Sequence, residues 1–160
     1  MRSALHLLHV LDGRIAARAG ATRAEHPWWP CADGCDHCCR SLARLPEITR
    51  AEWERLSPAI DALSDRDVVR ARIRAAPRSG PVTCPMLDRE HGSCRVYDAR
   101  PIACRTYGFY TERDGGLHCH LVTRAIEGHD DVVWGNGEAV ARDLDALGEK
   151  QTLDRWLDEP

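Results

Sequence analysis

The feature that most constrains this chain is the placement of its eight cysteines, all of which lie between residues 31 and 119. A first cluster, CADGCDHCC, holds four of them within nine residues. Three more recur at intervals of ten residues from Cys84 to Cys104, between turn-forming residues, and Cys119 follows alone. Thiols in such a pattern can form disulfides, pack as small apolar groups or bind soft metal ions, and each use implies different chemistry.

A disulfide framework is the first interpretation, because eight is an even number. Against it, the N-terminal stretch MRSALHLLHVLDGR is interrupted by His6 and His9 and lacks the small-residue cleavage site of a secretory signal. The neighbouring cysteines Cys38 and Cys39 could bond to each other only with strain. A chain of 160 residues can also bury a core without crosslinks. We therefore expect reduced thiols and a cytoplasmic location.

Metal binding explains the pattern better than the burial of free thiols, which would account for only one or two cysteines. Thiolates are soft donors that favour zinc and iron. The Cys35-x-x-Cys38 spacing is typical of zinc knuckles and iron–sulfur loops, and Gly34 and Gly92 permit tight turns beside the cysteines. The expected cofactor is zinc or iron, the iron either as single ions or as an iron–sulfur cluster.

Composition limits the other partners. The net charge of −3, with 29% charged residues, argues against nucleic-acid binding. No apolar run approaches the ~18 residues of a membrane span. Lys150 is the only lysine beside many arginines, which is typical of a GC-rich bacterial genome. Besides the metal ion, we keep open a protein partner that the metal would serve.

Hydrophobic periodicity predicts a mainly α fold. We expect a single domain of residues 1–160, with about five helices and one short β-hairpin around an irregular cysteine-rich core at 31–120. The helices are expected at 3–19, at 49–63 with a capping box formed by Thr49 and Glu52, from Ser64 onwards, at 137–148 and at 152–158. The helix at 3–19 would bury Leu5, Leu8, Leu11 and Ile15 and stop at Gly20. Asp114-Gly115-Gly116 would turn the hairpin and place Cys119 on the return strand.

Several residues near the cysteines have two interpretations each. Arg95, Arg100 and Arg105 could offset the charge of metal thiolates, or form surface salt bridges to Asp88, Glu90 or Asp98. Trp28 and Trp29 are expected to cover the cysteine cluster as packing. The histidines beside the cysteines, at positions 37, 91, 118 and 120, are expected to lie at the surface or behind the ligands.

The order of these motifs resembles the YkgJ-type cysteine-cluster proteins, whose hallmark is a CxxCxxCC cluster followed by a CPFLD-like segment. Two further family motifs, Gly-x-Cys-x-x-Tyr and Arg-Pro-x-x-Cys-Arg, match residues 92–97 and 100–105 closely. A later cysteine is also common in the family, and Cys119 fits that place. The resemblance covers roughly residues 31–120. It implies a domain that chelates zinc or iron.

All eight cysteines are predicted metal ligands: Cys31, Cys35, Cys38, Cys39, Cys84, Cys94, Cys104 and Cys119. The gap between Cys31 and Cys35 is one residue longer than in the family. We therefore expect Cys31 to matter less for metal content than Cys38, Cys84, Cys94 and Cys104.

The number and type of metal centres stay open at this point. In a strand, Cys38 and Cys39 would point in opposite directions. This favours two interpretations: they ligate neighbouring ions, or one of them is a ligand and the other packs. Eight thiolates could form two zinc sites, one four-cysteine iron–sulfur cluster or a multinuclear centre. Two function classes follow: a metal-binding module with a structural or stored ion, and an iron–sulfur or iron-dependent redox or modification enzyme.

Overall fold

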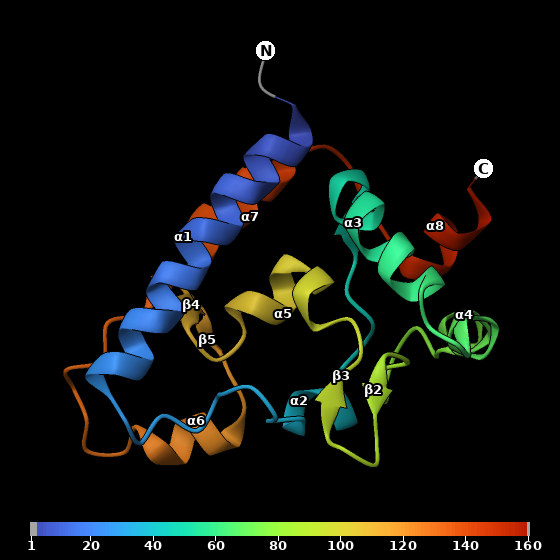
Figure 1. Ribbon diagram of the computed structural model, residues 1–160. Helices are drawn as coiled ribbons and strands as arrows, with labels where there is room; N and C mark the ends of the chain where they lie inside the picture. The colour runs from blue at the N-terminus through green and yellow to red at the C-terminus, as the bar shows by residue number, and fades with distance from the viewer. Residues whose placement is uncertain (1–2, 160) are drawn as a thin grey trace. The chain divides into compact units, whose positions relative to one another are not determined.

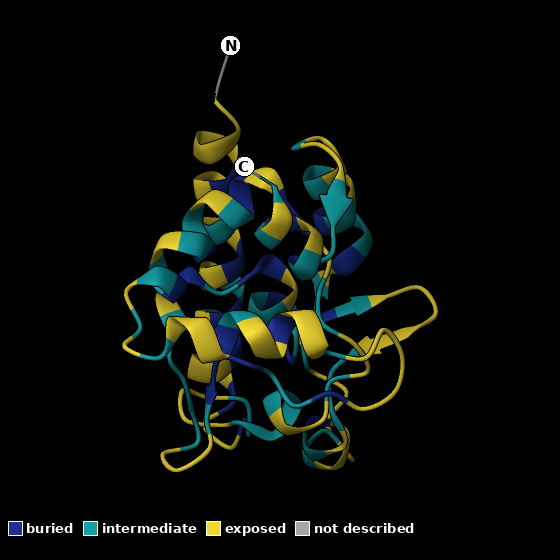
Figure 2. Cartoon of the chain, turned by 90° about the vertical axis from the view of Figure 1, so that its right-hand side faces the viewer, coloured by how far each residue is buried: buried dark blue, intermediate teal, exposed yellow. Residues whose placement is uncertain are grey.

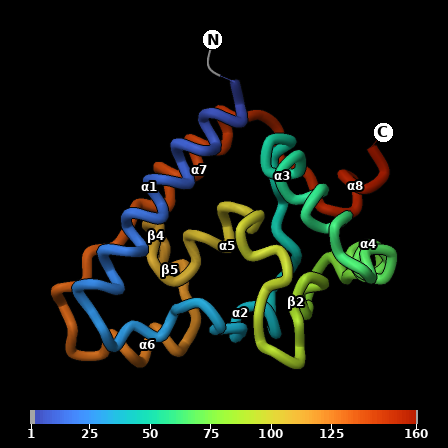
Figure 3. The backbone as a smooth tube through the Cα atoms, in the orientation of Figure 1, coloured from blue at the N-terminus to red at the C-terminus, as the bar shows by residue number. Residues whose placement is uncertain are grey.

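The structure is a computed structural model that describes residues 3–159. It is mainly helical with short strands, which confirms the predicted fold class (Figure 1). The chain forms two compact units. Unit 1 consists of Met1–Ala32 and Ile102–Leu147, and unit 2 of Asp33–Pro101 and Gly148–Pro160. Figure 3 traces this path, in which the chain leaves unit 1, builds most of unit 2, returns to unit 1 and ends in unit 2.

Unit 1 is built on the long helix α1 (Ala4–Glu25), which packs against α5 (Ile102–Thr106) and α7 (Gly137–Asp145). Its buried positions are Leu8, Leu11, Ile15, Ala19 and Thr22, spaced for one helix face. The predicted stop at Gly20 is wrong, because α1 continues for another turn. Leu5, predicted to be buried, is 50% exposed.

Unit 1 also contains a small sheet with strand order β5-β4-β6. Strand β4 (Tyr110–Glu112) pairs antiparallel with β5 (Gly115–Leu117) and parallel with β6 (Gly135–Asn136). The predicted hairpin is present, but Glu112 lies opposite Gly115, so the turn is formed by Arg113 and Asp114. Cys119 lies beyond β5 and immediately precedes α6 (His120–Ala125), so its predicted position on the return strand is wrong.

Unit 2 begins with α2 (His37–Arg40) and continues through β1 (Ile48–Thr49), α3 (Arg50–Asp61) and α4 (Arg66–Ala75). The hairpin of β2 (Leu87–Asp88) and β3 (Ser93–Cys94) follows, and then the 3-10 turn η1 (Tyr97–Ala99). Strand β7 (Lys150–Gln151) returns to pair with β1 before α8 (Leu153–Asp158). The predicted capping box is confirmed: the Thr49 backbone N–H donates to Glu52 Oε2 at 2.8 Å, and Thr49 Oγ1 accepts from the Glu52 N–H.

The core of unit 2 is apolar and contains residues from most of its elements: Ile48, Leu56, Ile60, Val69, Ile73, Met86, Val96, Ala99, Leu153 and Trp156. Trp156 satisfies its indole N–H by donating to the Ile48 carbonyl at 2.9 Å. Cys84 and Cys94 pack against the edge of this core. In Figure 2 most helices carry both buried and exposed residues, as expected for amphipathic helices.

The cysteine-rich segment is less irregular than predicted. Three short helices, α2, α5 and α6, lie within it, and each carries or adjoins a cysteine. Helices of four to six residues are too short for a hydrophobic period to reveal, and they depend on packing for stability. Across residues 3–159, no helix is both long enough and apolar enough to cross a membrane.

Candidate metal centre

The two units share the eight free cysteines unequally. Unit 2 holds five of them: Cys35, Cys38, Cys39, Cys84 and Cys94. Unit 1 holds Cys31, Cys104 and Cys119. The upstream cluster is therefore divided between the units after its first cysteine, at the position where the spacing departs from the family pattern.

Cys38 and Cys39 lie next to each other in α2, and their sulfurs are 4.0 Å apart. In a strand the two side chains would point in opposite directions, but these residues are helical, so that alternation does not apply to them. With Zn–S bonds of about 2.3 Å, the sulfurs of a tetrahedral zinc site lie about 3.8 Å apart. The Cys38–Cys39 separation is therefore compatible with ligation of one ion.

Long-range pairing brings Cys84 to this pair. Leu42 and Val82 form an isolated antiparallel bridge through two backbone bonds of 2.9 and 2.7 Å. Next to it, the Cys84 N–H donates to the Cys39 carbonyl at 2.7 Å, and the Cys84 thiol lies near enough to raise the pKa of Cys39. More than forty residues separate these two cysteines in the sequence. The bridge fixes which parts of the chain meet.

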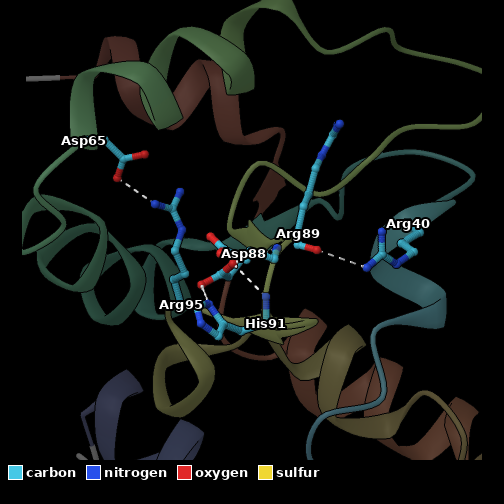
Figure 4. A network of polar contacts seen from close by, with 7 residues as sticks. Arg40, Asp65, Asp88, Arg89, His91 and Arg95 are labelled. Carbon is cyan, nitrogen blue, oxygen red and sulfur yellow. Dashed lines mark hydrogen bonds and ion pairs between the residues drawn. The ribbon is translucent and has the colours of Figure 1, made fainter.

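The β2–β3 hairpin delivers the fourth thiol, because Cys94 lies opposite Leu87 in its register. Asp88 shapes the turn: its Oδ1 accepts from the backbone N–H groups of Glu90 and His91 at 2.9 and 3.1 Å. Its Oδ2 lies 2.8 Å from His91 Nδ1 (Figure 4). Gly92 has a φ of +64°, which the turn needs and which disfavours other residues. The turn is therefore ordered by its own side chains.

We call Cys38, Cys39, Cys84 and Cys94 the four-thiol cluster. The hydrogen bond that Cys38 makes with Cys39, followed by burial, raises the pKa of Cys38 far above its ordinary value. For Cys39, the bond to Cys38 lowers the pKa, but the bond to Cys84, burial and the nearby thiols of Cys84 and Cys94 together raise it. Burial also raises the pKa of Cys94. The raised pKa values favour the protonated thiols of Cys38, Cys39 and Cys94, and a bound cation would offset the repulsion between their thiolates.

Arginines near the cluster act in the opposite direction. Arg100 and Arg95 favour the Cys94 thiolate and lower its pKa, although burial has the larger effect. Arg100 lies over the Tyr97 ring, 3.5 Å from its centre. Arg95 pairs with Asp65 at 2.6 Å, and not with any of the three acidic residues that the sequence suggested (Figure 4). In unit 1, Arg105 lies 3.3 Å from Asp12 of α1.

The cysteines of unit 1 have different surroundings. The Cys31 thiol donates to the Tyr107 carbonyl at 3.7 Å, and the Cys31 carbonyl accepts from Arg23 Nε at 3.1 Å. Gly108 has a φ of +94°, and a Cβ atom at this position would lie only 2.7 Å from the Cys31 sulfur. Cys104 lies within α5, and the carbonyl of Cys119 accepts from Thr123 in the first turn of α6. The Cys31 sulfur is thus seated against backbone.

Unit 1 contains a cluster of aromatic side chains that the sequence analysis did not predict. Trp29 is 6% exposed and stacks with Phe109, and it meets the edge of Trp134. Trp28 stacks on His129 at 4.2 Å, and His118 stacks on Trp134 at 5.0 Å. The tryptophans, expected to cover the upstream cysteines, therefore form the packing of unit 1. Sequence reasoning missed Trp134 and His129 because they lie about a hundred residues away from the Trp pair.

Unit 1 also has an open surface pocket of about 380 Å³. It contains no cysteine and is lined by Thr111, Glu112, Arg113, Trp134, Gly135, Asn136 and Glu138. Because none of its lining residues is a cysteine, this pocket is not a thiolate metal site.

The fit to a metal ion depends on the donors more than on their present orientation. Among residues 3–159, no three His, Cys, Asp or Glu side chains are arranged so that they could hold a metal ion as they stand. The four-thiol cluster nevertheless supplies four soft donors within one unit, which is the number and type that zinc and iron sites use. Each sulfur can be redirected by one side-chain torsion without a change in the backbone. The donor set therefore fits zinc or iron.

These features define the class first: a mainly helical protein with clustered cysteine donors for a soft metal ion. The family model CxxCxxCC, described as "Putative zinc- or iron-chelating domain", matches residues 30–124, which is more than half of the chain. The chain belongs to this family, and the resemblance found from the motifs is confirmed. No curated protein and no solved structure matches the chain.

Proposed function

We propose that the chain binds one zinc or iron ion through Cys38, Cys39, Cys84 and Cys94. Membership of a zinc- or iron-chelating family supports metal binding, and the gathering of four thiols within unit 2 supports this ligand set. The observation that carries the proposal is the meeting of the Cys38–Cys39 pair with Cys84, through a backbone bond of 2.7 Å from the Cys84 N–H to the Cys39 carbonyl. Four thiols gathered within one unit are a donor set that a soft cation can use.

The proposed role of the ion is structural or storage. Bringing Cys84 to Cys39 closes a long loop, and the entropy cost of closure increases with the logarithm of loop length. A thiolate-bound ion supplies a divalent charge that compensates the thiolates and holds these two segments together. Zinc–thiolate binding contributes roughly ten kcal/mol in small peptides. Unit 2 also has its own apolar core, so we expect the ion to stabilise the cysteine segments more than the helices.

The remaining cysteines extend the proposal. Cys35 is exposed and lies two residues before α2, and its ligation stays a prediction. Ligation by Cys31, Cys104 and Cys119 stays a prediction, as does a second ion. A cytoplasmic location and a protein partner that receives the metal also stay predictions; reduced thiols, which metal binding requires, are the reason for the first.

An iron–sulfur or iron-dependent enzyme is the second candidate function. The observation in its favour is that four cysteine thiolates are also the usual ligands of a [2Fe–2S] or [4Fe–4S] cluster. A coloured protein with iron and acid-labile sulfide would favour this candidate. A colourless protein with one zinc per chain would favour the structural module.

The test is elemental analysis and an absorption spectrum of the full chain purified without oxygen, for the wild type and for single Cys→Ser variants. We expect C38S, C39S, C84S and C94S to lose most of the metal. The matched control C31S removes a thiol that bonds to a backbone carbonyl, and it should keep its metal. Metal below about 0.3 per chain in folded wild-type protein would contradict the proposal, since one ion per chain is expected.

A further inference from the structure

Helix α2 is the element that presents two of the four thiols, and by itself it is weak. It has four residues, and its N-cap, Asp36, makes no side-chain hydrogen bond to the helix backbone. A single helical turn is not stable in isolation. The position of Cys38 and Cys39 therefore depends on contacts that α2 makes with the rest of unit 2.

On one side, α2 is joined to the chain before the hairpin. The Cys39 carbonyl accepts from Cys84, and the Arg40 carbonyl accepts from Thr83 Oγ1 at 3.4 Å. These bonds hold the C-terminal end of α2. Other contacts must hold its N-terminal end and prevent the helix from rotating.

The other side is held by the Arg40 side chain. Its guanidinium forms an ion pair with Asp36 at 2.5 Å, four residues earlier. It also donates to the Arg89 carbonyl in the hairpin turn at 3.4 Å (Figure 4). Gly92 of the same turn packs against Asp36, since a Cβ atom there would lie 3.2 Å from Asp36 Oδ2. Asp36, Arg40 and the turn thus form one contact between α2 and the hairpin.

The hairpin is a rigid partner for this contact. Asp88 closes its turn through two backbone bonds, and Arg95 ties β3 to Asp65, which precedes α4. A guanidinium can pair with a carboxylate and donate to a carbonyl at the same time because its planar fork carries several donors, whereas a lysine ammonium is a point charge.

We propose that Arg40 is a positioning residue for the four-thiol cluster: through Asp36 and the Arg89 carbonyl, it holds α2 against the β2–β3 turn. It thereby sets the sulfurs of Cys38 and Cys39 relative to Cys84 and Cys94. This inference deepens the proposed function and rests on it for its metal readout. Arg40 is half exposed, so its ion pair contributes little to global stability. Its effect should appear instead in how precisely the thiols of Cys38 and Cys39 are positioned.

The experiment compares R40Q, R40K and D36N with the wild type in the full chain. The control is R44Q, because Arg44 is an exposed arginine four residues further along. Cobalt(II) titration without oxygen reports affinity, and the thiolate-to-cobalt absorption reports how many sulfurs bind. We expect R40Q to weaken cobalt binding about tenfold and to reduce this absorption, as the loss of groups that orient metal ligands typically does. R40K should recover only part of the loss, and R44Q should match the wild type.

A metal-independent readout separates this proposal from the function on which it rests. Maleimide labelling of metal-depleted protein, mapped by mass spectrometry, should show faster modification of Cys38 and Cys39 in R40Q, with no change at Cys31. Because Arg40 acts through Asp36, the effects of R40Q and D36N should not add in the double variant. If the wild type binds no cobalt, the proposed function fails while labelling still tests Arg40. Wild-type labelling rates in R40Q would overturn the positioning role.

Discussion

In unit 2, Cys38 and Cys39 lie side by side and Cys84 is bonded to Cys39 through the backbone, while Cys84 and Cys94 pack at the edge of an apolar core. In unit 1, the Cys31 thiol instead donates to a backbone carbonyl beneath a glycine that leaves room for it. The same residue type thus has two uses in one chain. The neighbouring thiols of unit 2 are candidate metal donors, whereas the Cys31 thiol, which bonds to a backbone carbonyl, contributes to packing.

Metal removal tests this comparison most strongly. With the ion bound, hydrogen exchange in segments 37–42 and 82–95 should be slow. Chelation should speed exchange there by about a hundredfold or more, because the ion offsets loop closure. The segment around Cys31 and helix α7 should change little. Equal protection of 37–42 and 82–95 in loaded and depleted protein, with the loss of metal verified, would mean that the ion does not order unit 2.

Truncation of the apolar core tests whether unit 2 has stability of its own. Leu56 is fully buried, so Leu56→Ala should lower the free energy of unfolding by about 2–5 kcal/mol, through lost contacts and the cavity left behind. Urea denaturation of metal-depleted protein measures this. Leu5→Ala is the control, because Leu5 is half exposed, and it should change stability by less than about 0.5 kcal/mol. A negligible effect of Leu56→Ala would show that metal-depleted unit 2 has already lost its core.

The surroundings of the Cys31 thiol can be changed by a substitution at a neighbouring residue, without mutating Cys31 itself. Gly108→Ala introduces a side chain at a φ of +94° and a Cβ atom 2.7 Å from the Cys31 sulfur, so it should destabilise the protein by about 1–3 kcal/mol. Thermal unfolding of the variant measures the loss.

Gly20→Ala is the matched control, since no atom lies within 4 Å of its added Cβ and the residue is helical. This change should stabilise the protein by up to about 1 kcal/mol. Combining Gly108→Ala with Cys31→Ala should recover the part of the loss due to contact, but not the part due to φ. Unchanged metal content in Gly108→Ala would keep Cys31 outside the thiolate centre, while a loss like that of C84S would contradict the comparison.

The smallest expected effect concerns the hairpin turn in acid. The Asp88 pKa is lowered from its ordinary value of 3.8, chiefly because the carboxylate accepts the His91 backbone N–H and also bonds the His91 ring. Ionised Asp88 therefore stabilises the turn at pH values above 3.8, and this contribution is lost as the pH falls through the lowered pKa. Carboxyl carbon shifts followed by NMR should titrate below 3.8, and Asp88→Asn should speed exchange of the Glu90 and His91 amides at neutral pH. Titration of Asp88 at or above 3.8 would contradict this.

Local sequence signals predicted the long helices and indicated a soft metal ion. Helix α3 begins where the Thr49–Glu52 box predicts it, since an N-cap is a local interaction within four residues. The buried stripes of α1 and α3 follow from helical periodicity. Clustered cysteines in an order typical of the family indicated a soft metal, because the preference of thiolates for such ions is a property of the side chain.

Tertiary structure decided which cysteines meet. The direction of Cys38 and Cys39 depends on α2, which is too short to reveal itself by periodicity and is held by the Leu42–Val82 bridge and by Arg40. The seat of Cys31 depends on Gly108, far along the chain. Helix α1 passes through Gly20 because its buried neighbours Ala19 and Thr22 pack within unit 1, which outweighs the modest local preference against glycine. Long-range contacts of this kind have no local pattern, because they are set by which surfaces bury each other when the chain folds.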